Sequence, residues 1–262
     1  MRYIDTSEKF RFGVWCSSMF KLLRGREIYK RAENIEDFFN IHQGKRCFIL
    51  GNGPSLQIKD LSLLCEEITF AANKIFLCYD QTKWRPTYYV AEDDRIIREN
   101  LKEINSIRSS IKLLRNLDGV TYDGDGKTVL FNMYFPEQED FPQFSCDPRR
   151  GLACGYTVTF VALQWAFYMG FEKIYLLGVD FNYPGLKYLP NGTVELPPEG
   201  THFLPGYGRP GEIFWAPKLA ESLQAYAIAK SVFEDNGRQI FNATRGGKLE
   251  IFPRTDFDTL FS

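Results

Sequence analysis

The stretch Arg46-Cys47-Phe48-Ile49-Leu50-Gly51-Asn52-Gly53-Pro54-Ser55-Leu56 decides how this chain folds. An apolar run leads directly into a turn that contains two glycines. A short apolar run of this kind is typical of a strand buried on both faces of a parallel sheet. Glycines after such a strand let the backbone approach an anionic group, which the N–H groups at a helix start stabilise. The stretch therefore predicts the first strand of an α/β domain and a phosphate-binding turn; the alternative is a plain strand-to-helix turn in which Ser55 caps the helix.

Further apolar runs alternate with helical patterns along the rest of the chain. The predicted later strands are residues 68–72, 87–91, 111–114, 129–134, 173–177 and 239–242. The predicted helices are residues 95–108, 157–169 and 217–236. This alternation is typical of a Rossmann-like, doubly wound α/β fold with a mostly parallel sheet. We therefore expect one nucleotide-binding catalytic domain over residues 44–262.

Two segments depart from this alternation. Residues 1–43 interleave cations with apolar side chains, and we expect a helical appendage packed on the domain. The alternative is a basic amphipathic segment that contacts a membrane surface or a partner. Residues 182–216 are rich in glycine and proline and show little periodicity. A loop of this length inside a compact domain is usually a lid or a binding loop, so we expect a lid over the site.

The overall composition excludes several classes of protein. The net charge is −1, so no general basic field would recruit nucleic acid. The six cysteines are scattered without a CxxC pair, which indicates free thiols in a reducing cytoplasm. Only two histidines occur, which argues against a His-rich metal site. No apolar run is long enough to span a bilayer, and the N-terminus does not resemble a secretory signal. We expect a cytoplasmic protein.

Polar residues follow three of the predicted strands, at the edge where an open α/β sheet presents its ligand-binding groups. Asn73 could read a base or a ribose, or cap a helix. Glu92, Asp93 and Asp94 could bind Mg²⁺ or ribose hydroxyls, or supply carboxylates to a helix N-terminus. Asp180 could hold a ribose, a metal or a backbone turn.

Two tyrosines and a histidine lie in the predicted lid. The hydroxyls of Tyr183 and Tyr188 could donate to a phosphate, with core packing as the competing interpretation. His202 lies in Gly200-Thr201-His202-Phe203 and could serve as a general base near neutral pH. A lone histidine is more often structural, so the residue alone leaves both roles open.

These motifs together resemble the 6-hydroxymethylpterin pyrophosphokinase-like family, which is common among bacterial surface-polysaccharide genes. The resemblance runs from about Lys45 to Phe261, and its marks are residues 51–56, 86–93, 157–180 and 242–249. The same skeleton resembles the Campylobacter-type sialyltransferases, which are inverting, metal-independent enzymes of a GT-A-like fold that use a CMP-sugar. The flagellin-modifying motility-associated factors combine a related domain with nonulosonate transfer.

The sialyltransferase resemblance implies a role for each candidate residue. The residues implied in nucleotide binding are Gly51, Asn52, Gly53, Ser55, Asn73, Thr157 and Asp180. Tyr183 and Tyr188 would support the leaving phosphate, and His202 would be the catalytic base. The match is incomplete, because Ala91-Glu92-Asp93 replaces a Tyr-Asn-Pro motif, Asn182 is an extra residue, and residues 155–159 differ. We therefore expect Glu92 and Asp93 near the donor sugar or the acceptor.

The sequence thus predicts an inverting glycosyltransferase for surface glycan assembly. Its donor would be a CMP-activated nonulosonate or related keto sugar acid, and no metal or other cofactor would be required. Its acceptor would be a glycan or lipid-linked glycan. Peripheral contact of the protein with the inner membrane face and a homo-oligomer are both left open. The alternatives are an ATP-dependent pterin pyrophosphokinase, with Mg²⁺ on Glu92, Asp93 or Asp180, and a nucleotide-binding module without chemistry.

Overall fold

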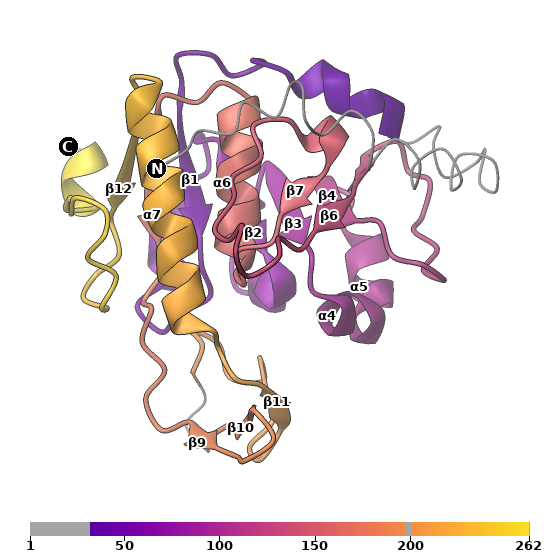
Figure 1. Ribbon diagram of the computed structural model, residues 1–262, viewed down its shortest axis with the longest axis vertical. Helices are drawn as coiled ribbons and strands as arrows, with labels where there is room; N and C mark the ends of the chain where they lie inside the picture. Colours follow the sequence, from indigo (N-terminus) through magenta and orange to yellow (C-terminus); the bar gives the residue numbers. More distant parts are fainter. Residues whose placement is uncertain (1–31, 198–200, 262) are drawn as a thin grey trace.

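The structure, a computed structural model, describes residues 32–197 and 201–261. Its centre is a seven-stranded sheet in the order β12-β8-β1-β2-β3-β4-β5, in which each pair of neighbours is parallel (Figure 1). The strands are β1 (Arg46–Leu50), β2 (Thr69–Ala72), β3 (Tyr88–Ala91), β4 (Ile111–Arg115), β5 (Thr128–Phe131), β8 (Lys173–Leu177) and β12 (Gln239–Asn242). The doubly wound α/β fold predicted from the sequence is confirmed.

Helices cover both faces of this sheet. One face carries η2 (Ala32–Phe38), η4 (Pro148–Arg150), α6 (Val158–Tyr168) and α7 (Leu219–Asp235). The other carries α3 (Ile58–Leu63), η3 (Asn73–Cys78), α4 (Asp94–Glu99), α5 (Leu101–Ser106) and η5 (Asp258–Phe261). Successive residues of β1 enter opposite layers, since Cys47 and Ile49 pack on the α6 side and Phe48 and Leu50 on the α3 side. Burial on both faces explains why β1 is continuously apolar.

Two predicted elements are divided in the structure. The helix expected over residues 95–108 breaks at Asn100, whose backbone N–H and side-chain amide both donate to the carbonyl of Ile96. The strand expected over residues 129–134 leaves the main sheet after β5. Its continuation, β6 (Met133–Tyr134), pairs instead with β7 (Leu152–Ala153). The helix break at Asn100 was not predicted, because apolar periodicity does not reveal a side chain that hydrogen-bonds to the backbone of its own helix.

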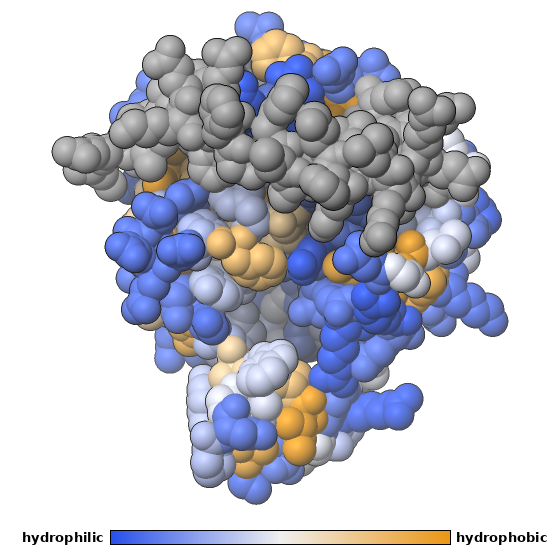
Figure 2. Space-filling model, turned by 45° about the vertical axis from the view of Figure 1, so that its right-hand side comes forward, coloured by the Kyte–Doolittle hydropathy of each residue, from blue (hydrophilic) through white to orange (hydrophobic). Residues whose placement is uncertain are grey.

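Residues 182–216, where the sequence predicts a lid, include short strands that the sequence did not predict. They contain an antiparallel sheet of β9 (Lys187–Tyr188), β10 (Thr193–Glu195) and β11 (Ile213–Trp215). Figure 1 shows this sheet as a lobe at the bottom of the molecule, and Figure 2 shows a recess between the lobe and the body. The lobe is tied to α4, because Arg95 pairs with Glu212 and donates to the carbonyl of Ile213. The short strands escaped notice because glycine and proline interrupt them.

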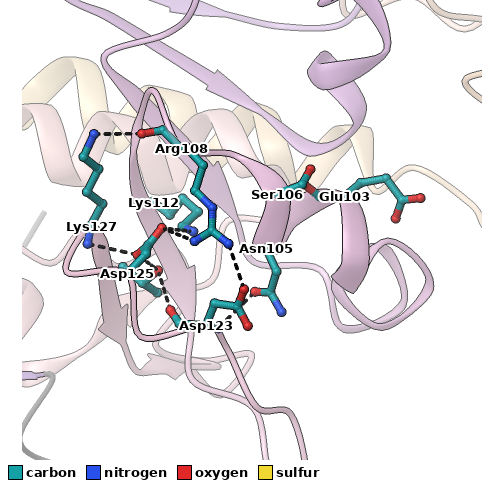
Figure 3. Close-up of polar contacts among 9 residues, drawn as sticks. Glu103, Asn105, Ser106, Arg108, Lys112, Asp123, Asp125 and Lys127 are labelled. Carbon is teal, nitrogen blue, oxygen red and sulfur yellow. Dashed lines mark hydrogen bonds and ion pairs between the residues drawn. The ribbon is translucent and has the colours of Figure 1, made fainter.

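An ion-pair network closes the amino end of β4, away from the edge that carries the candidate site (Figure 3). The buried ammonium of Lys112 lies 2.6 Å from a carboxylate oxygen of Asp125. Arg108 contacts both Asp123 and Asp125, and Lys127 donates to the Arg108 carbonyl. Burial alone would raise the pKa of Asp125, but the hydrogen bonds it accepts lower that pKa to about 2. This network belongs to the scaffold of the sheet.

The described part of the predicted appendage packs on the domain. Ile35 and Phe38 are buried beside α6, and His42 shares a 2.6 Å hydrogen bond with the hydroxyl of Tyr88. Residues 1–31 lie outside the described residues. Within those residues the five cysteines are free, and no helix has the length and apolar character needed to cross a membrane.

The direction of winding reverses at β1. From β1 the chain proceeds to β2, β3 and β4 on one side, whereas β8 lies against the other side. Open α/β sheets bind their ligands outside the carboxyl ends of the strands at such a switch point. The turn after β1 and the residues after β8 occupy this position.

Candidate functional site

The glycine turn is pressed against the carboxyl end of β8. The N–H of Gly51 donates to the carbonyl of Leu177, and that of Gly53 donates to the carbonyl of Gly178. A β-carbon on Gly51 would lie 2.3 Å from the Gly178 carbonyl oxygen. One on Gly53 would lie 1.9 Å from a carboxylate oxygen of Asp180. Both positions therefore require glycine, because the turn lies too close to the Gly178 carbonyl and the Asp180 carboxylate for a side chain.

Asp180 holds this turn from the other side. One of its carboxylate oxygens accepts from the Ser55 hydroxyl at 2.8 Å and the other from the Ser55 N–H at 3.3 Å. The Asp180 carbonyl accepts from the N–H of Lys248 at 2.7 Å. Of the three roles left open for Asp180, the geometry favours holding a backbone turn. Ser55 thus binds Asp180, and the N-cap residue of the following helix α3 is Gln57 rather than Ser55.

Two asparagine side chains, that of Asn52 in the turn and that of Asn73 after β2, form a polar surface that we call the floor. The side-chain amide of Asn52 donates to the carbonyl of Ala72 at 3.0 Å and to the hydroxyl of Tyr207 at 3.2 Å. The side-chain oxygens of Asn52 and Asn73 are buried and have no hydrogen-bond partner within the described chain. A buried acceptor without a donor costs about 1–3 kcal/mol. A ligand that brings N–H or O–H groups to this floor would satisfy both oxygens.

His202 lies above this floor, stacked on Tyr207. The ring centroids are 3.7 Å apart and the planes differ by 11°. Its Nδ1 is 3.1 Å from the hydroxyl oxygen of Thr201. Burial, and secondarily the charge of Lys74, lower the pKa of His202 to about 4. The imidazole is therefore neutral at physiological pH and able to accept a proton.

The segment 201–207 and the glycine turn are joined by direct contacts. The N–H of Phe203 donates to the carbonyl of Asn52 at 3.0 Å, and the ammonium of Lys74 donates to the carbonyl of Tyr207 at 2.9 Å. Residues 201–207 consequently contact both the turn after β1 and the segment after β2. These contacts hold residues 201–207 against the glycine turn.

The two candidate tyrosines differ in their surroundings. Tyr183 is partly exposed and lies within electrostatic range of Asp180, Tyr207 and Tyr226. Partial desolvation raises the pKa of Tyr183, so its hydroxyl stays protonated and able to donate. Tyr188 is 61% exposed on β9, so its ring packs little against the core. The structure brings Tyr183 close to the turn, whereas Tyr188 lies on the lobe.

Thr157 stands at the start of α6, on the same edge of the sheet. It is the N-cap residue of the helix, yet its side chain makes no capping hydrogen bond. Its hydroxyl lies 3.3 Å from that of Tyr226 on α7. The start of α6 therefore keeps the capacity of a helix N-terminus for a negatively charged group.

The acidic residues after β3 have different roles. Asp93 caps α4, accepting from the N–H of Ile96 at 2.8 Å, which agrees with the helix-start alternative. Burial, followed by the charge of Asp93, raises the pKa of Glu92 to about 7. Among residues 32–197 and 201–261 no three acidic, histidine or cysteine side chains gather in a metal-ligating group.

The raised pKa of Glu92 predicts a pH-dependent stability. Its ordinary value is 4.5, so between pH 4.5 and 7 the folded state binds more protons than the unfolded one. Stability contributed by the protonated form is then lost as the pH rises through this window. We expect Glu92→Gln to raise the free energy of unfolding by about 1–2 kcal/mol at pH 8, allowing for partial solvent screening, and to change it little at pH 4.5.

Thermal denaturation at both pH values checks this expectation. Glu103→Gln, which alters an exposed carboxylate on α5, is the matched control and should show no comparable difference. An equal effect of Glu92→Gln at pH 4.5 and pH 8 would contradict a buried, titrating carboxyl.

Sequence reasoning missed Tyr207. It joins three of the candidate residues, since it stacks on His202, hydrogen-bonds Asn52 and lies beside Asn73. The available signal was its place between Gly206 and Gly208, where the sequence offers an aromatic ring little local core to enter.

Comparison with known proteins adds a family and a fold. A family model described as 6-hydroxymethylpterin diphosphokinase MptE-like matches residues 24–185. The structure of the MAf glycosyltransferase from Magnetospirillum magneticum AMB-1 is similar, with a TM-score of 0.51 at 14% sequence identity. The match covers 93% of this chain and 42% of that one, so this chain spans about two-fifths of that protein's length. No curated protein matches the sequence.

Proposed function

The chain belongs to the 6-hydroxymethylpterin diphosphokinase MptE-like family, and from this premise and its fold we propose that it is a glycosyltransferase. The donor is a CMP-activated nonulosonate or a related keto sugar acid. The acceptor is a surface glycan or its lipid-linked precursor, and the reaction takes place in the cytoplasm or at the inner membrane face. The fold it shares with a glycosyltransferase supports the class, and the resemblance to the sialyltransferase motifs supports the donor.

One observation carries the proposal, namely the link from the neutral histidine through Tyr207 to the glycine turn. His202 stacks on Tyr207, which in turn hydrogen-bonds Asn52 within the glycine turn. A base placed there acts on the same ligand whose phosphate lies against Gly51 and Gly53. A base beside the glycine turn favours transfer of a group from a nucleotide over nucleotide binding alone.

The proposed reaction follows from these positions. His202 takes the proton of the acceptor hydroxyl while that oxygen forms a bond to the anomeric carbon. The bond from the anomeric carbon to the phosphate oxygen breaks, and CMP departs with the electron pair. Tyr183, with Tyr188 carried by the lobe, donates to the phosphate as its charge develops. Attack opposite to the leaving group inverts the configuration.

The family description favours a second candidate, a pterin pyrophosphokinase. This reaction would use ATP and Mg²⁺, with the metal held by Glu92, Asp93 or Asp180. The contacts of Asp180 with Ser55 and of Asp93 with α4 leave both carboxylates engaged within the protein. A nucleotide-binding module without chemistry is the third candidate, which the catalytic test of His202 addresses.

A thermal-shift screen of CMP, CDP, UDP, GDP and ATP, each with Mg²⁺ or EDTA, separates these candidates. We expect the cytidine nucleotides to raise the melting temperature most, because a ligand that binds only the folded state stabilises it by mass action. At a concentration of about 100 times Kd the gain is about 2.7 kcal/mol. We also expect EDTA to leave the shift and the transfer activity largely intact. A strong, Mg²⁺-dependent response to ATP with none to CMP would favour the pyrophosphokinase.

A further inference from the structure

One of the segments that carry the family resemblance, residues 242–249, has no role in the proposed reaction. It begins at Asn242, the last residue of β12, whose buried side chain closes a loop. The side-chain oxygen of Asn242 accepts from the N–H of Thr244 at 3.0 Å, and its amide donates to the carbonyl of Leu249 at 2.7 Å. We call the segment between these two bonds, residues 244–248, the 244–248 loop.

Arg254 fixes the course of the 244–248 loop. Its guanidinium donates to the carbonyl of Thr244 at 3.1 Å and to the carbonyl of Gly246 at 2.7 Å. It also forms an ion pair with Glu250. A guanidinium presents its N–H donors in a rigid fork, so this single side chain orients several carbonyls of the loop at once.

The 244–248 loop contacts the segment that follows β8. The hydroxyl oxygen of Thr244 accepts from the N–H of Val179 at 3.1 Å, and the N–H of Lys248 donates to the carbonyl of Asp180 at 2.7 Å. Gly247 has a φ of +74°, and a β-carbon on it would lie 2.7 Å from the same Asp180 carbonyl oxygen. Glycine is required there for both reasons, because the loop approaches the backbone of Asp180 closely.

The same segment after β8 holds the glycine turn. The carbonyl of Gly178 accepts from the N–H of Gly53 at 2.9 Å, and the carboxylate of Asp180 accepts from Ser55. The next residue, Phe181, has a φ of +51°, which is a strained conformation for a bulky side chain. Such a conformation persists only where the surrounding structure fixes it, and the contacts of the preceding paragraph are part of that structure.

We propose that the 244–248 loop positions the glycine turn for the donor phosphate, with Thr244 and Arg254 as its positioning residues. The strand order β12-β8-β1 places the loop, the segment after β8 and the turn in one row at the carboxyl edge of the sheet. Arg254 orients the loop, Thr244 holds the segment after β8, and that segment holds the turn. The proposal rests on the proposed function for the phosphate, whereas the support of the turn follows from the hydrogen bonds alone.

The first arm of the test measures hydrogen exchange of the full chain by mass spectrometry, without any ligand. In Thr244→Val the buried N–H of Val179 loses its acceptor, so we expect the amides of residues 51–56 to exchange about tenfold faster through easier local opening. Arg254→Gln should act in the same way. Thr244→Ser keeps the hydroxyl and should restore the parental rate. Glu250→Gln, which removes only the charge that pairs with Arg254, is the control for the ion pair.

The second arm is a calorimetric titration of CMP. We expect Thr244→Val and Arg254→Gln each to weaken CMP binding about tenfold, as the loss of one hydrogen bond that orders the site can do. Thr69→Val is the matched control, because Thr69 is a buried residue at the start of β2 whose hydroxyl oxygen accepts from the N–H of Thr87. It should lower the melting temperature in a similar way and leave the affinity for CMP unchanged.

Each outcome of the two arms decides something, once circular dichroism has shown that the variants are folded. Faster exchange of residues 51–56 in a protein whose parent binds no CMP supports the positioning role and overturns the proposed donor. Unchanged exchange in both Thr244→Val and Arg254→Gln overturns the positioning role. An equal loss of CMP affinity in Thr69→Val overturns it as well, and so does faster exchange without any loss of CMP affinity.

Discussion

Replacing His202 by alanine is expected to lower the rate of sugar transfer by ~10²–10⁴-fold, the usual contribution of a general base. The affinity for CMP should change less than threefold, because a base acts in the transition state rather than in ground-state binding. The neutral imidazole required of a base at pH 7 follows from its lowered pKa of about 4. Single-turnover rates and calorimetric titration of CMP measure the two quantities separately.

The neighbouring ring provides the control for this variant. Tyr207→Phe keeps the stacked ring under His202 but removes the hydroxyl that accepts from Asn52. It should weaken CMP binding modestly and leave the rate of the bound complex within about tenfold, because one neutral hydrogen bond is worth about 1 kcal/mol. A His202→Ala variant that transfers sugar at the parental rate would assign the base to another residue. If the chain is a nucleotide-binding module without chemistry, neither the parent protein nor the variant transfers sugar.

The second large effect is expected at Gly53. Its added β-carbon in Gly53→Ala would lie 1.9 Å from a carboxylate oxygen of Asp180 and 2.8 Å from the Gly178 carbonyl, so the turn must move. Displacing it breaks the hydrogen bond from the Gly53 N–H and disturbs the contacts between Asp180 and Ser55. We expect nucleotide affinity to fall by about 100-fold, since the phosphate loses the surface of the turn against which it is proposed to lie.

A surface glycine tests whether the loss is local. Gly119 has a φ of +73° and nothing within 4 Å of an added β-carbon. Gly119→Ala should cost about 1 kcal/mol of stability through backbone strain and leave nucleotide affinity unchanged. Nucleotide binding by Gly53→Ala at parental affinity, measured by calorimetry on folded protein, would move the phosphate away from this turn.

The central sheet was predictable because its information is local. The apolar side chains of residues 46–50 and of residues 173–177 are each typical of a buried strand. The structure places these two strands, β1 and β8, side by side. The helix at α6 was equally clear, since nearly all of its residues are buried. By contrast, Asn100 breaks a helix through a bond of its own side chain, which no apolar period records.

The chain by itself determined the order of strands and helices and the glycine turn after β1, because these depend on residues within a few positions of one another. Only the tertiary structure decided what each polar residue contacts. Asp180 meets Ser55 across 125 positions, and Tyr207 meets Asn52 across 155. Contacts of this separation follow from how the strands associate and how the lobe packs, and a pattern with a period of two or 3.6 residues carries no record of them.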